Sequence, residues 1–408
     1  MSTGDCLPPL ASRTESRAAQ SPVGVPYRRR LPGRRRTRIG IVLILTLGLV
    51  ALGLLRPVRV AAQSLLILAE VIPDVPVRPL LWFSVPPEHV EFDYQSATGP
   101  IESDVYLPAS GSQHSAVILY TGAFGLRHEP AFVSFAEALA RSGAVVMVPE
   151  SAALRAGEIS ADEVDGLLKA LAYLRARPEV DPARIGIFGF SAGGSIVLLT
   201  AETTRGRDEI AFANIFGAYF DAQQLLREVA SQTIVVDGTP VPWEPDKVAV
   251  YAVNKQVIES LADPVDRELL SHAYLDEPGG QAIELDRLSP EGRLVLELLE
   301  HPTAERVDNI LADLPPATQA HLASISPGRA VSQLKTHLFV MHDRSDTFVP
   351  FTHSRELARM APPGSMHASV EFDLFGHVTP NRHLDARTFA GEMVKLFQLA
   401  WLLGQEFL

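Results

Sequence analysis

Cysteine is almost absent from this 408-residue chain, since Cys6 is its only one. A single cysteine cannot form an internal disulfide, and so cysteine-poor a composition suits either redox compartment. The chain also lacks a P-loop, a G-x-G-x-x-G, an H-E-x-x-H and a C-x-x-C motif. We therefore expect no nucleotide cofactor and no structural metal. There is no internal repeat and no coiled-coil heptad pattern.

Charge is absent from residues 39–55 (IGIVLILTLGLVALGLL), an apolar run bounded by Arg38 and Arg56. Its length is the lower limit for a membrane span, because about 30 Å of hydrocarbon at 1.5 Å per residue needs about 20 residues. Residues 1–38 carry nine Arg against one Asp and one Glu, in a chain whose net charge is −12. A basic cluster before a span favours a cytoplasmic amino terminus. We expect a single-pass signal-anchor at 39–55, with the bulk of the chain outside the cytoplasm.

A cleaved signal peptide is the alternative, since Val60-Ala61-Ala62 offers a small-residue cleavage site. The long arginine-rich leader, together with Arg56 and Arg59, favours the anchor. A basic run can also bind nucleic acid, but beside an apolar span the topogenic role is favoured, so no nucleic-acid partner is expected. Residues 1–38 are rich in Ser, Pro, Ala and Arg without an apolar period, which predicts a disordered cytoplasmic tail.

Residues 56–89 are predicted to form an interfacial helix and a connector. The stretch 58–71 is apolar with few polar interruptions, and Pro73 and Pro76 end it. Because it directly follows the expected span, we favour a helix lying on the bilayer surface, with packing on the globular part as the alternative.

From Val90 onward, strand and helix patterns alternate. Two loosely period-two stretches, 90–94 and 101–107, predict antiparallel strands at a sheet edge. Further strands are predicted at 116–120, 144–148, 185–188, 211–215, 337–341 and 369–374. Helices are predicted at 130–141, at 160–177 with Ser160 and Glu163 as a capping box, at 192–202 and at 354–360. Strands separated by helices of this length imply parallel βαβ units with right-handed crossovers.

Between residues 221 and 333 the strand rhythm stops and the apolar spacing becomes helical. Helices are predicted at 247–262, 265–274, 290–300 and 304–314, with Ser289 and Thr303 as N-caps. We expect 221–333 to be a helical cap insertion between two parts of one α/β core, 90–220 and 334–408.

The most informative motif is G-x-S-x-G at Gly189–Gly193, with Ser191 at its centre. Such a motif occurs by chance in about one chain in seven of this length. Here it follows a predicted buried strand and opens a helix, which is the setting of a nucleophile elbow. Small neighbours permit the strained serine, and the helix start places backbone amides beside its hydroxyl. A glycine-rich turn without chemistry is the alternative.

Residues 181–194 (DPARIGIFGFSAGG) resemble the elbow region of the α/β-hydrolase superfamily, particularly its dienelactone hydrolase-like and prolyl-oligopeptidase-like branches. The resemblance covers roughly 90–220 and 334–408. It implies an α/β-hydrolase fold, a mostly parallel sheet flanked by helices, to which this chain adds a helical cap and an N-terminal transmembrane helix. Dienelactone hydrolases proper use a cysteine nucleophile. This chain has Ser191 instead, so their substrate is not carried over.

A serine nucleophile needs a base, and the base needs a carboxylate to orient it. In this superfamily their order along the chain is serine, acid, histidine. Residues 339–350 resemble the acid loop, which selects Asp346 ahead of a Val-Pro step and leaves Asp343 as the alternative. His377 follows the last predicted strand and Gly376, and is the expected base.

The oxyanion formed on acyl attack requires backbone donors that are already in place. One is the amide of Ala192, directly after the nucleophile. The other is expected from the loop after Tyr120, where this chain has Thr121-Gly122 instead of the His-Gly of many relatives. We expect the amide of Ala123 to serve, with Phe124 as the alternative. The nearby Arg127 and His128 either bound the following helix or contact an anionic substrate.

These residues predict a membrane-anchored serine hydrolase of carboxylic esters, with Ser191, Asp346 and His377 as its triad. The apolar cap helices favour small lipid-like or aromatic esters. Three rivals stay open: a peptidase, an acyltransferase using the same triad, and a binding protein whose hydrolase chemistry is lost.

Overall fold

The computed structural model describes residues 55–72, 77–276, 285–380 and 384–408, all within the unit Leu55–Leu408. The predicted tail (1–38) and nearly all of the predicted anchor (39–55) lie outside these residues. Across the described ranges, no helix has both the length and the apolar character that crossing a membrane requires.

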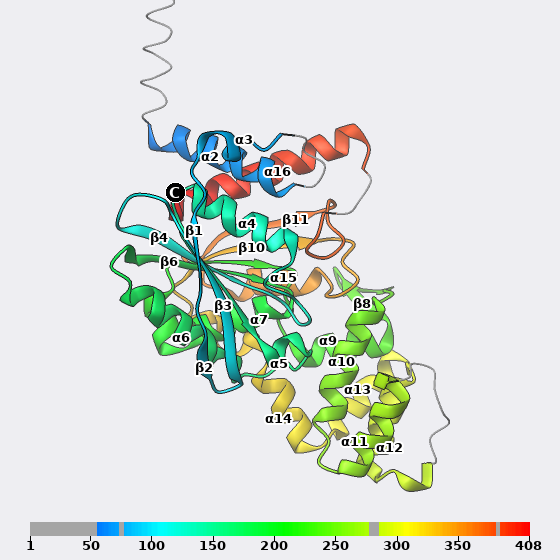
Figure 1. Ribbon diagram of the computed structural model, residues 1–408. Coiled ribbons are helices and arrows are strands. Elements are labelled where there is room, and N and C mark those ends of the chain that lie inside the picture. The colour runs from blue at the N-terminus through cyan, green and yellow to red at the C-terminus, as the bar shows by residue number, and fades with distance from the viewer. Residues whose placement is uncertain (1–54, 73–76, 277–284, 381–383) are drawn as a thin grey trace, which may run out of the picture. The chain divides into compact units, whose positions relative to one another are not determined.

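A mostly parallel sheet forms the centre of this unit (Figure 1). Within the described residues its strand order is β1-β3-β5-β4-β6-β7-β10-β11, and β2 pairs with β3 off this path. β3 is antiparallel to β1, β2 and β5, whereas the pairs from β5 to β11 are parallel. The strands are β1 (Glu88–Glu91), β2 (Tyr94–Ser96), β3 (Gly99–Leu107), β4 (His114–Tyr120), β5 (Val145–Ser151), β6 (Val180–Phe190), β7 (Phe212–Phe216), β10 (His337–Asp343) and β11 (Met366–Phe372).

The mostly parallel sheet predicted from the sequence is confirmed, with one difference at its edge. Residues 90–94 were expected as one strand, but Phe92 and Asp93 separate β1 from β2. The Phe92 ring turns away to stack on Tyr173, at 4.1 Å between ring centroids. An aromatic contact with a neighbouring helix therefore interrupts the period-two pattern.

Helices cover both faces of the sheet (Figure 1). One face is covered by α4 (Pro130–Arg141) and α16 (Ala386–Phe407), and the other by α6 (Glu163–Ala176), α7 (Ala192–Glu202), α8 (Thr204–Glu209) and α15 (Thr352–Met360). The short α5 (Ala152–Arg155) lies between β5 and α6. Neighbouring strand residues alternate between the two cores, as Val117 and Ile118 do. This two-sided burial explains the continuous apolar runs in the sequence.

α2 (Arg56–Val71) packs on α16 and α4, and α3 (Pro79–Phe83) packs against α2. Val60 and Ile67 are buried on the inner side of α2. Ser64 Oγ donates a hydrogen bond to the Ala400 carbonyl at 3.1 Å. One side of the helix therefore lies on the globular part, as in the alternative interpretation of this segment.

The prediction of a capping box at Ser160 and Glu163 is wrong. α6 begins at Glu163 with Asp162 as its N-cap, and the Glu163 side chain turns inward. Its two carboxylate oxygens accept hydrogen bonds from the hydroxyls of Tyr120 and Ser151, both at 2.7 Å. Because these two hydroxyls come from buried strands, the carboxylate satisfies polar groups of the core and is not free to cap the helix.

The insertion between β7 and β10 is largely helical, as predicted, and Ser289 and Thr303 cap their helices. A hairpin of β8 (Thr233–Val236) and β9 (Thr239–Pro242) interrupts it, so the prediction of purely helical structure is wrong there. The turn is Asp237-Gly238, and both residues have positive φ, 48° and 80°. The helices are α9 (Ala222–Ser231), α10 (Lys247–Glu259), α11 (Pro264–Ser271), α12 (Pro290–Leu299), α13 (Ala304–Asp313) and α14 (Pro316–Ser324).

The two ends of the insertion meet where it leaves the core. The amide of Ala222 donates to Ser326 Oγ at 2.9 Å. The amide of Gly328 donates to the Phe220 carbonyl at 3.1 Å. Together these bonds form a neck between the insertion and the sheet.

Candidate active site

Ser191 lies at the turn between β6 and α7, where it is the N-cap of α7. Its backbone is strained, with φ 53° and ψ −134°, a conformation that a non-glycine residue rarely adopts. The surrounding glycines make room for it. A Cβ on Gly193 would stand 2.1 Å from the carbonyl oxygen of Thr121, and one on Gly189 would stand 2.6 Å from Gly194 Cα. The glycines of the motif are therefore required by close backbone approach.

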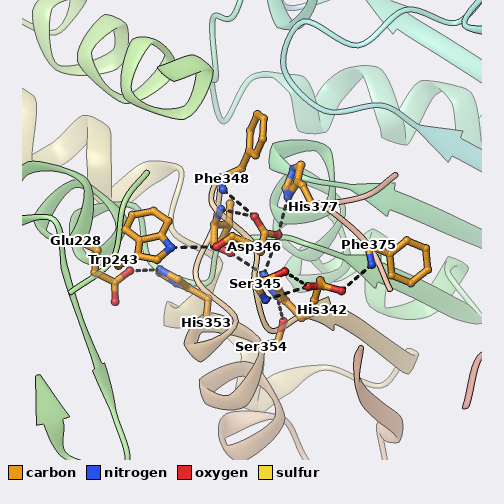
Figure 2. A network of polar contacts seen from close by, with 12 residues as sticks. Glu228, Trp243, His342, Ser345, Asp346, Phe348, His353, Ser354, Phe375 and His377 are labelled. Atoms are coloured by element: carbon orange, nitrogen blue, oxygen red, sulfur yellow. Dashed lines mark hydrogen bonds and ion pairs between the residues drawn. The ribbon is translucent and has the colours of Figure 1, made fainter. Parts of the chain in front are cut away.

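Asp346 and His377 meet in the loops after β10 and β11 (Figure 2). His377 Nδ1 lies 2.6 Å from Asp346 Oδ2. The other carboxylate oxygen accepts the amides of Phe348 at 2.7 Å and Val349 at 3.0 Å. The ring of Phe348 stacks on the imidazole of His377, at 4.6 Å between centroids. The carboxylate thus fixes the orientation of the imidazole and has its own backbone donors.

Burial works to raise the pKa of Asp346, but the neighbouring imidazoles of His377 and His342 outweigh it. These contacts and the hydrogen bonds hold the pKa of the carboxyl well below its ordinary value. The carboxylate is therefore ionised at neutral pH and can stabilise an imidazolium on His377.

Asp343, the alternative acid, has a different set of partners. One of its oxygens accepts the amide and hydroxyl of Ser345, at 2.9 and 2.7 Å. The other accepts the amide of Phe375 at 2.7 Å, two residues before His377. Asp343 therefore ties the acid loop to the histidine loop, and Asp346 is the carboxylate that contacts the imidazole.

His342 is a part of the network that the sequence did not reveal. It is fully buried, and its Nε2 lies 2.8 Å from the Val349 carbonyl and 3.3 Å from Asp346 Oδ2. Since a carbonyl only accepts, Nε2 carries the proton, and Nδ1 accepts from the hydroxyl of Ser354. His342 thus supports the carboxylate from the side opposite His377 (Figure 2).

Ser191 and His377 line the same cavity, but they do not hydrogen-bond directly in this structure. His377 Nε2 is buried and has no partner among the described residues. Catalytic hydrogen bonds are often long or misaligned before substrate binds and tighten in the complex. His377 has a positive φ of 83°, so this loop, like the elbow, holds a strained backbone.

Two amides beside Ser191 remain available for an oxyanion. Within the described residues, those of Ala192 and Ala123 donate no hydrogen bond. The amide of Phe124 donates to the Leu154 carbonyl at 3.1 Å, which removes the alternative donor. A Cβ on Gly122 would stand 2.7 Å from Ser191 Cβ, so the glycine at this position keeps the nucleophile clear.

The cavity over Ser191 has a volume of about 370 Å³. The core contributes Phe132, Phe190 and Ala192 to its lining, and the cap contributes Leu225, Val253 and Leu322. The carboxyl end of α2 contributes Val71. Within the described residues the lining has no Lys or Arg, and Glu129 is its one acidic side chain. The walls therefore suit a neutral, largely apolar group.

Arg127 does not face this cavity. Its guanidinium lies 2.7 Å from Asp104 and 3.0 Å from Glu102, and its amide donates to Glu150 at 2.7 Å. These bonds match the interpretation in which Arg127 bounds the helix and makes no substrate contact.

Within the described ranges, one group of three side chains could hold a metal: His337, His367 and Glu406. His337 begins β10, at the amino ends of the strands, whereas Ser191 follows the carboxyl end of β6. This cluster is therefore remote from the candidate triad.

The cap is hydrogen-bonded to the acid loop. Trp243 Nε1 donates to the Asp346 carbonyl at 3.0 Å, and the amide of Asp246 donates to the Thr347 carbonyl at 2.7 Å. His353 Nε2 lies 2.9 Å from Glu228 of α9, and both side chains are buried (Figure 2). No local sequence signal marks these long-range contacts.

The strand order, with a strained serine between β6 and α7, defines an α/β-hydrolase fold. The sequence profile described as "Dienelactone hydrolase family" matches residues 101–238, so a domain of that family covers about a third of the chain. The match includes Ser191 but ends before Asp346 and His377. The chain therefore contains a region similar to the dienelactone hydrolase family within an α/β-hydrolase fold.

Similar solved structures include a 2,6-dihydroxy-pseudo-oxynicotine hydrolase, at 14% identity over 79% of this chain and 69% of that one, with a TM-score of 0.43. The acylaminoacyl peptidase of Pyrococcus horikoshii gives 12% over 79% and 41%, with a TM-score of 0.46. An esterase of Pyrobaculum calidifontis gives 17% over 85% and 91%, with a TM-score of 0.41. The chain thus spans about two fifths of the peptidase. No curated protein matches the sequence.

Proposed function

We propose that the chain is a membrane-anchored serine hydrolase that cleaves carboxylic esters through an acyl-enzyme on Ser191. One observation carries the proposal. The strained Ser191 and the buried Nε2 of His377 line one cavity, while Nδ1 of His377 is held by Asp346 at 2.6 Å. A nucleophile, a base and a group that orients the base are the parts required for acyl transfer.

In the first half of the reaction, Ser191 Oγ attacks the ester carbonyl carbon and its proton passes to His377 Nε2. The amides of Ala192 and Ala123 stabilise the negative oxygen of the tetrahedral intermediate. The intermediate collapses, the alcohol leaves with the proton from Nε2, and the acyl group stays on Ser191. In the second half, water loses a proton to Nε2, attacks the acyl carbonyl and releases the carboxylic acid and free Ser191.

The lining of the cavity supports an apolar acyl group as the part of the substrate that is bound. Its walls are mainly aliphatic and aromatic, and the described lining has no Lys or Arg that could pair with a free carboxylate on the substrate. A dianionic or highly polar substrate would lose its hydration without compensation. Neutral lipid-like or aromatic esters are therefore the favoured substrates.

The anchoring part of the proposal is supported by sequence. The uncharged run 39–55 follows a strongly basic segment, which favours a cytoplasmic amino terminus and a catalytic part outside the cytoplasm. A cysteine-labelling experiment at Cys6 in intact cells tests this orientation. Labelling only after the membrane is permeabilised supports it, and labelling by an impermeant reagent in intact cells contradicts it.

The direct test of the chemistry is covalent labelling of the full chain by a fluorophosphonate. Ser191→Ala should abolish labelling and lower ester turnover by about 10⁴-fold or more. Ser142→Ala is the matched control, because that hydroxyl only donates to the Ala138 carbonyl at 2.9 Å. A folded parent protein that fails to label would refute the proposal and favour a binding protein.

A substrate panel separates the remaining rivals. Nitrophenyl esters of graded acyl length should be hydrolysed, whereas aminoacyl nitroanilides should not. Preferential cleavage of the anilides would indicate a peptidase. Transfer of the acyl group to an added alcohol in preference to water would indicate an acyltransferase.

A further inference from the structure

Large apolar side chains are exposed together on α3 and beside it. Leu81 is 50% exposed, Trp82 64% and Phe83 84%. Three more exposed side chains lie nearby in the chain or on the adjoining α2: Leu65, Val77 and Val85. Single exposed apolar residues are ordinary, but a contiguous group of this kind marks an interaction surface.

This exposure is built into the local structure. The Glu70 carboxylate is buried in α2 and accepts the amide of Leu80 at 3.0 Å. Leu80 is itself buried. At the other end of α3, Arg141 of α4 donates to the Ser84 carbonyl at 3.4 Å. α3 is thus fixed at both ends, and the three residues between Leu80 and Ser84 are held outward.

The outer side of α2, the helix against which α3 packs, is also apolar. Leu55, Val58, Ala62 and Leu65 are exposed at helical spacing. The acidic residue of α2, Glu70, is buried, whereas the exposed charges of the helix are cationic: Arg56 and Arg59. An apolar stripe flanked by arginines and aromatic residues is the composition of a helix that lies on an anionic membrane.

Two further observations single out a membrane as the partner. The uncharged run 39–55 ends at Leu55, where α2 begins, so chain connectivity keeps α2 beside the end of the proposed anchor. Val71, the last residue of α2, lines the cavity over Ser191 with Phe132 and Phe135 of α4. One helix therefore contributes to both the exposed surface and the cavity.

The geometry points to a phospholipid bilayer as the occupant of this docking face, which consists of the exposed apolar residues Leu55, Val58, Leu65, Val77, Leu81, Trp82, Phe83 and Val85. Trp82 and Phe83 insert among the headgroups, the arginines of α2 contact anionic lipid, and ester substrates reach Ser191 from the membrane. This inference rests on the proposed function, since it assigns the source of that enzyme's substrate.

Trp82 provides a native probe, since the chain has only three tryptophans. The full chain is reconstituted in phosphatidylcholine–phosphatidylglycerol vesicles, with and without lipids brominated near the headgroup. Bromolipid should quench the fluorescence, and the quenched part should fall by at least half in Trp82→Phe. The control Trp243→Phe, in the cap, should retain it. Equal quenching of the wild type and Trp82→Phe overturns the inference.

Activity gives a second readout. The double variant Leu81→Ser/Phe83→Ser should lower hydrolysis of a long-chain ester embedded in vesicles at least tenfold, and leave hydrolysis of a soluble short-chain ester within twofold. The matched control is Leu285→Ser, a leucine that is 57% exposed in the cap. Its rates should not change on either substrate. Unchanged vesicle activity in the double variant overturns the inference.

Other occupants of the face give different results. In a Cys6→Ser background, Phe83→Cys should not form disulfide-linked dimers, and efficient cross-linking would assign the face to a second copy of the chain. Coverage by residues 39–54 of the same chain would protect Trp82 from bromolipid and also overturn the inference. Failure of the proposed function is recognised separately, as loss of soluble-ester hydrolysis and of fluorophosphonate labelling.

Discussion

The serine elbow and the acid–histidine loops meet at one cavity, yet they are held by different forces. Ser191 is positioned by backbone sterics, since glycines at 189 and 193 allow main chains to touch where a Cβ would collide. Asp346 and His377 are positioned by hydrogen bonds from amides and buried side chains. The elbow therefore tolerates no added atoms, and the acid–histidine loops tolerate no lost polar groups.

The largest expected effect comes from Asp346→Asn, which removes a charge from the acid–histidine side without changing its size. The amide cannot stabilise the imidazolium or select its productive tautomer, so kcat/KM on a soluble ester should fall by about 10⁴-fold, as in serine proteases. Steady-state kinetics would measure this loss. A decrease of less than tenfold would show that another carboxylate orients His377, and Asp343→Asn would then show the larger loss.

A larger side chain in the serine elbow should disrupt its structure. Gly193→Ala places a Cβ 2.1 Å from the Thr121 carbonyl oxygen, so the backbone must move. We expect a loss of about 3 kcal/mol in unfolding free energy, together with weaker fluorophosphonate labelling. Gly391→Ala is the matched helical control, since nothing lies within 4 Å of its Cβ. That variant should be stabilised by about 0.5–1 kcal/mol, and equal effects in urea denaturation would contradict the steric argument.

Asp343→Asn tests whether Asp343 stabilises the acid and histidine loops without taking part in catalysis. The Phe375 amide and the Ser345 hydroxyl would lose a charged acceptor, which should cost about 1–3 kcal/mol of unfolding free energy. Because Asp343 does not contact His377, kcat should fall far less than in Asp346→Asn. Denaturation and kinetics on the same preparation separate the two effects, and a stable variant with strongly reduced kcat would contradict this assignment.

The smallest predicted effect is a pH dependence. The pKa of Asp346 is depressed in the folded state, so its stabilising contribution is present above the unfolded-state pKa of about 3.9 and lost as pH falls toward the folded value. The stability difference between wild type and Asp346→Asn should narrow by about 1 kcal/mol between pH 7 and pH 3. Urea denaturation at the two pH values measures it, and a constant difference would contradict the assigned interaction.

The parts of the molecule that the sequence predicts are those encoded locally. Continuous apolar runs locate the buried strands, and Gly189–Gly193 locates the turn at Ser191 because sterics there depend on adjacent residues. The prediction of a capping box is wrong because the Glu163 carboxylate accepts hydrogen bonds from hydroxyls on two strands of the sheet. The Asp237-Gly238 turn is a hairpin signal, but each flanking strand has only four residues and β9 also contains two prolines. Strands this short do not show a period-two pattern.

The candidate triad residues were predicted from motif and order, whereas the groups that support them were not. Trp243 and Glu228 act through contacts with residues more than a hundred positions away, about which spacing along the chain carries no information. His342 lies only four residues before Asp346, but no motif marks it as a partner of the carboxylate. α16 was not predicted at all, although Asp385 caps it and its apolar residues follow a helical period.

The neck formed by Phe220, Ala222, Ser326 and Gly328 holds the two ends of the insertion together. Because the insertion leaves and rejoins the core at hydrogen-bonded positions, a short linker could replace everything between them without shifting the register of β7 against β10. Loop closure costs little extra as a segment lengthens. An exchanged insertion would change the roof of the cavity. To keep the acid loop in place it would have to supply the donors that Trp243 and Asp246 give to the carbonyls of Asp346 and Thr347.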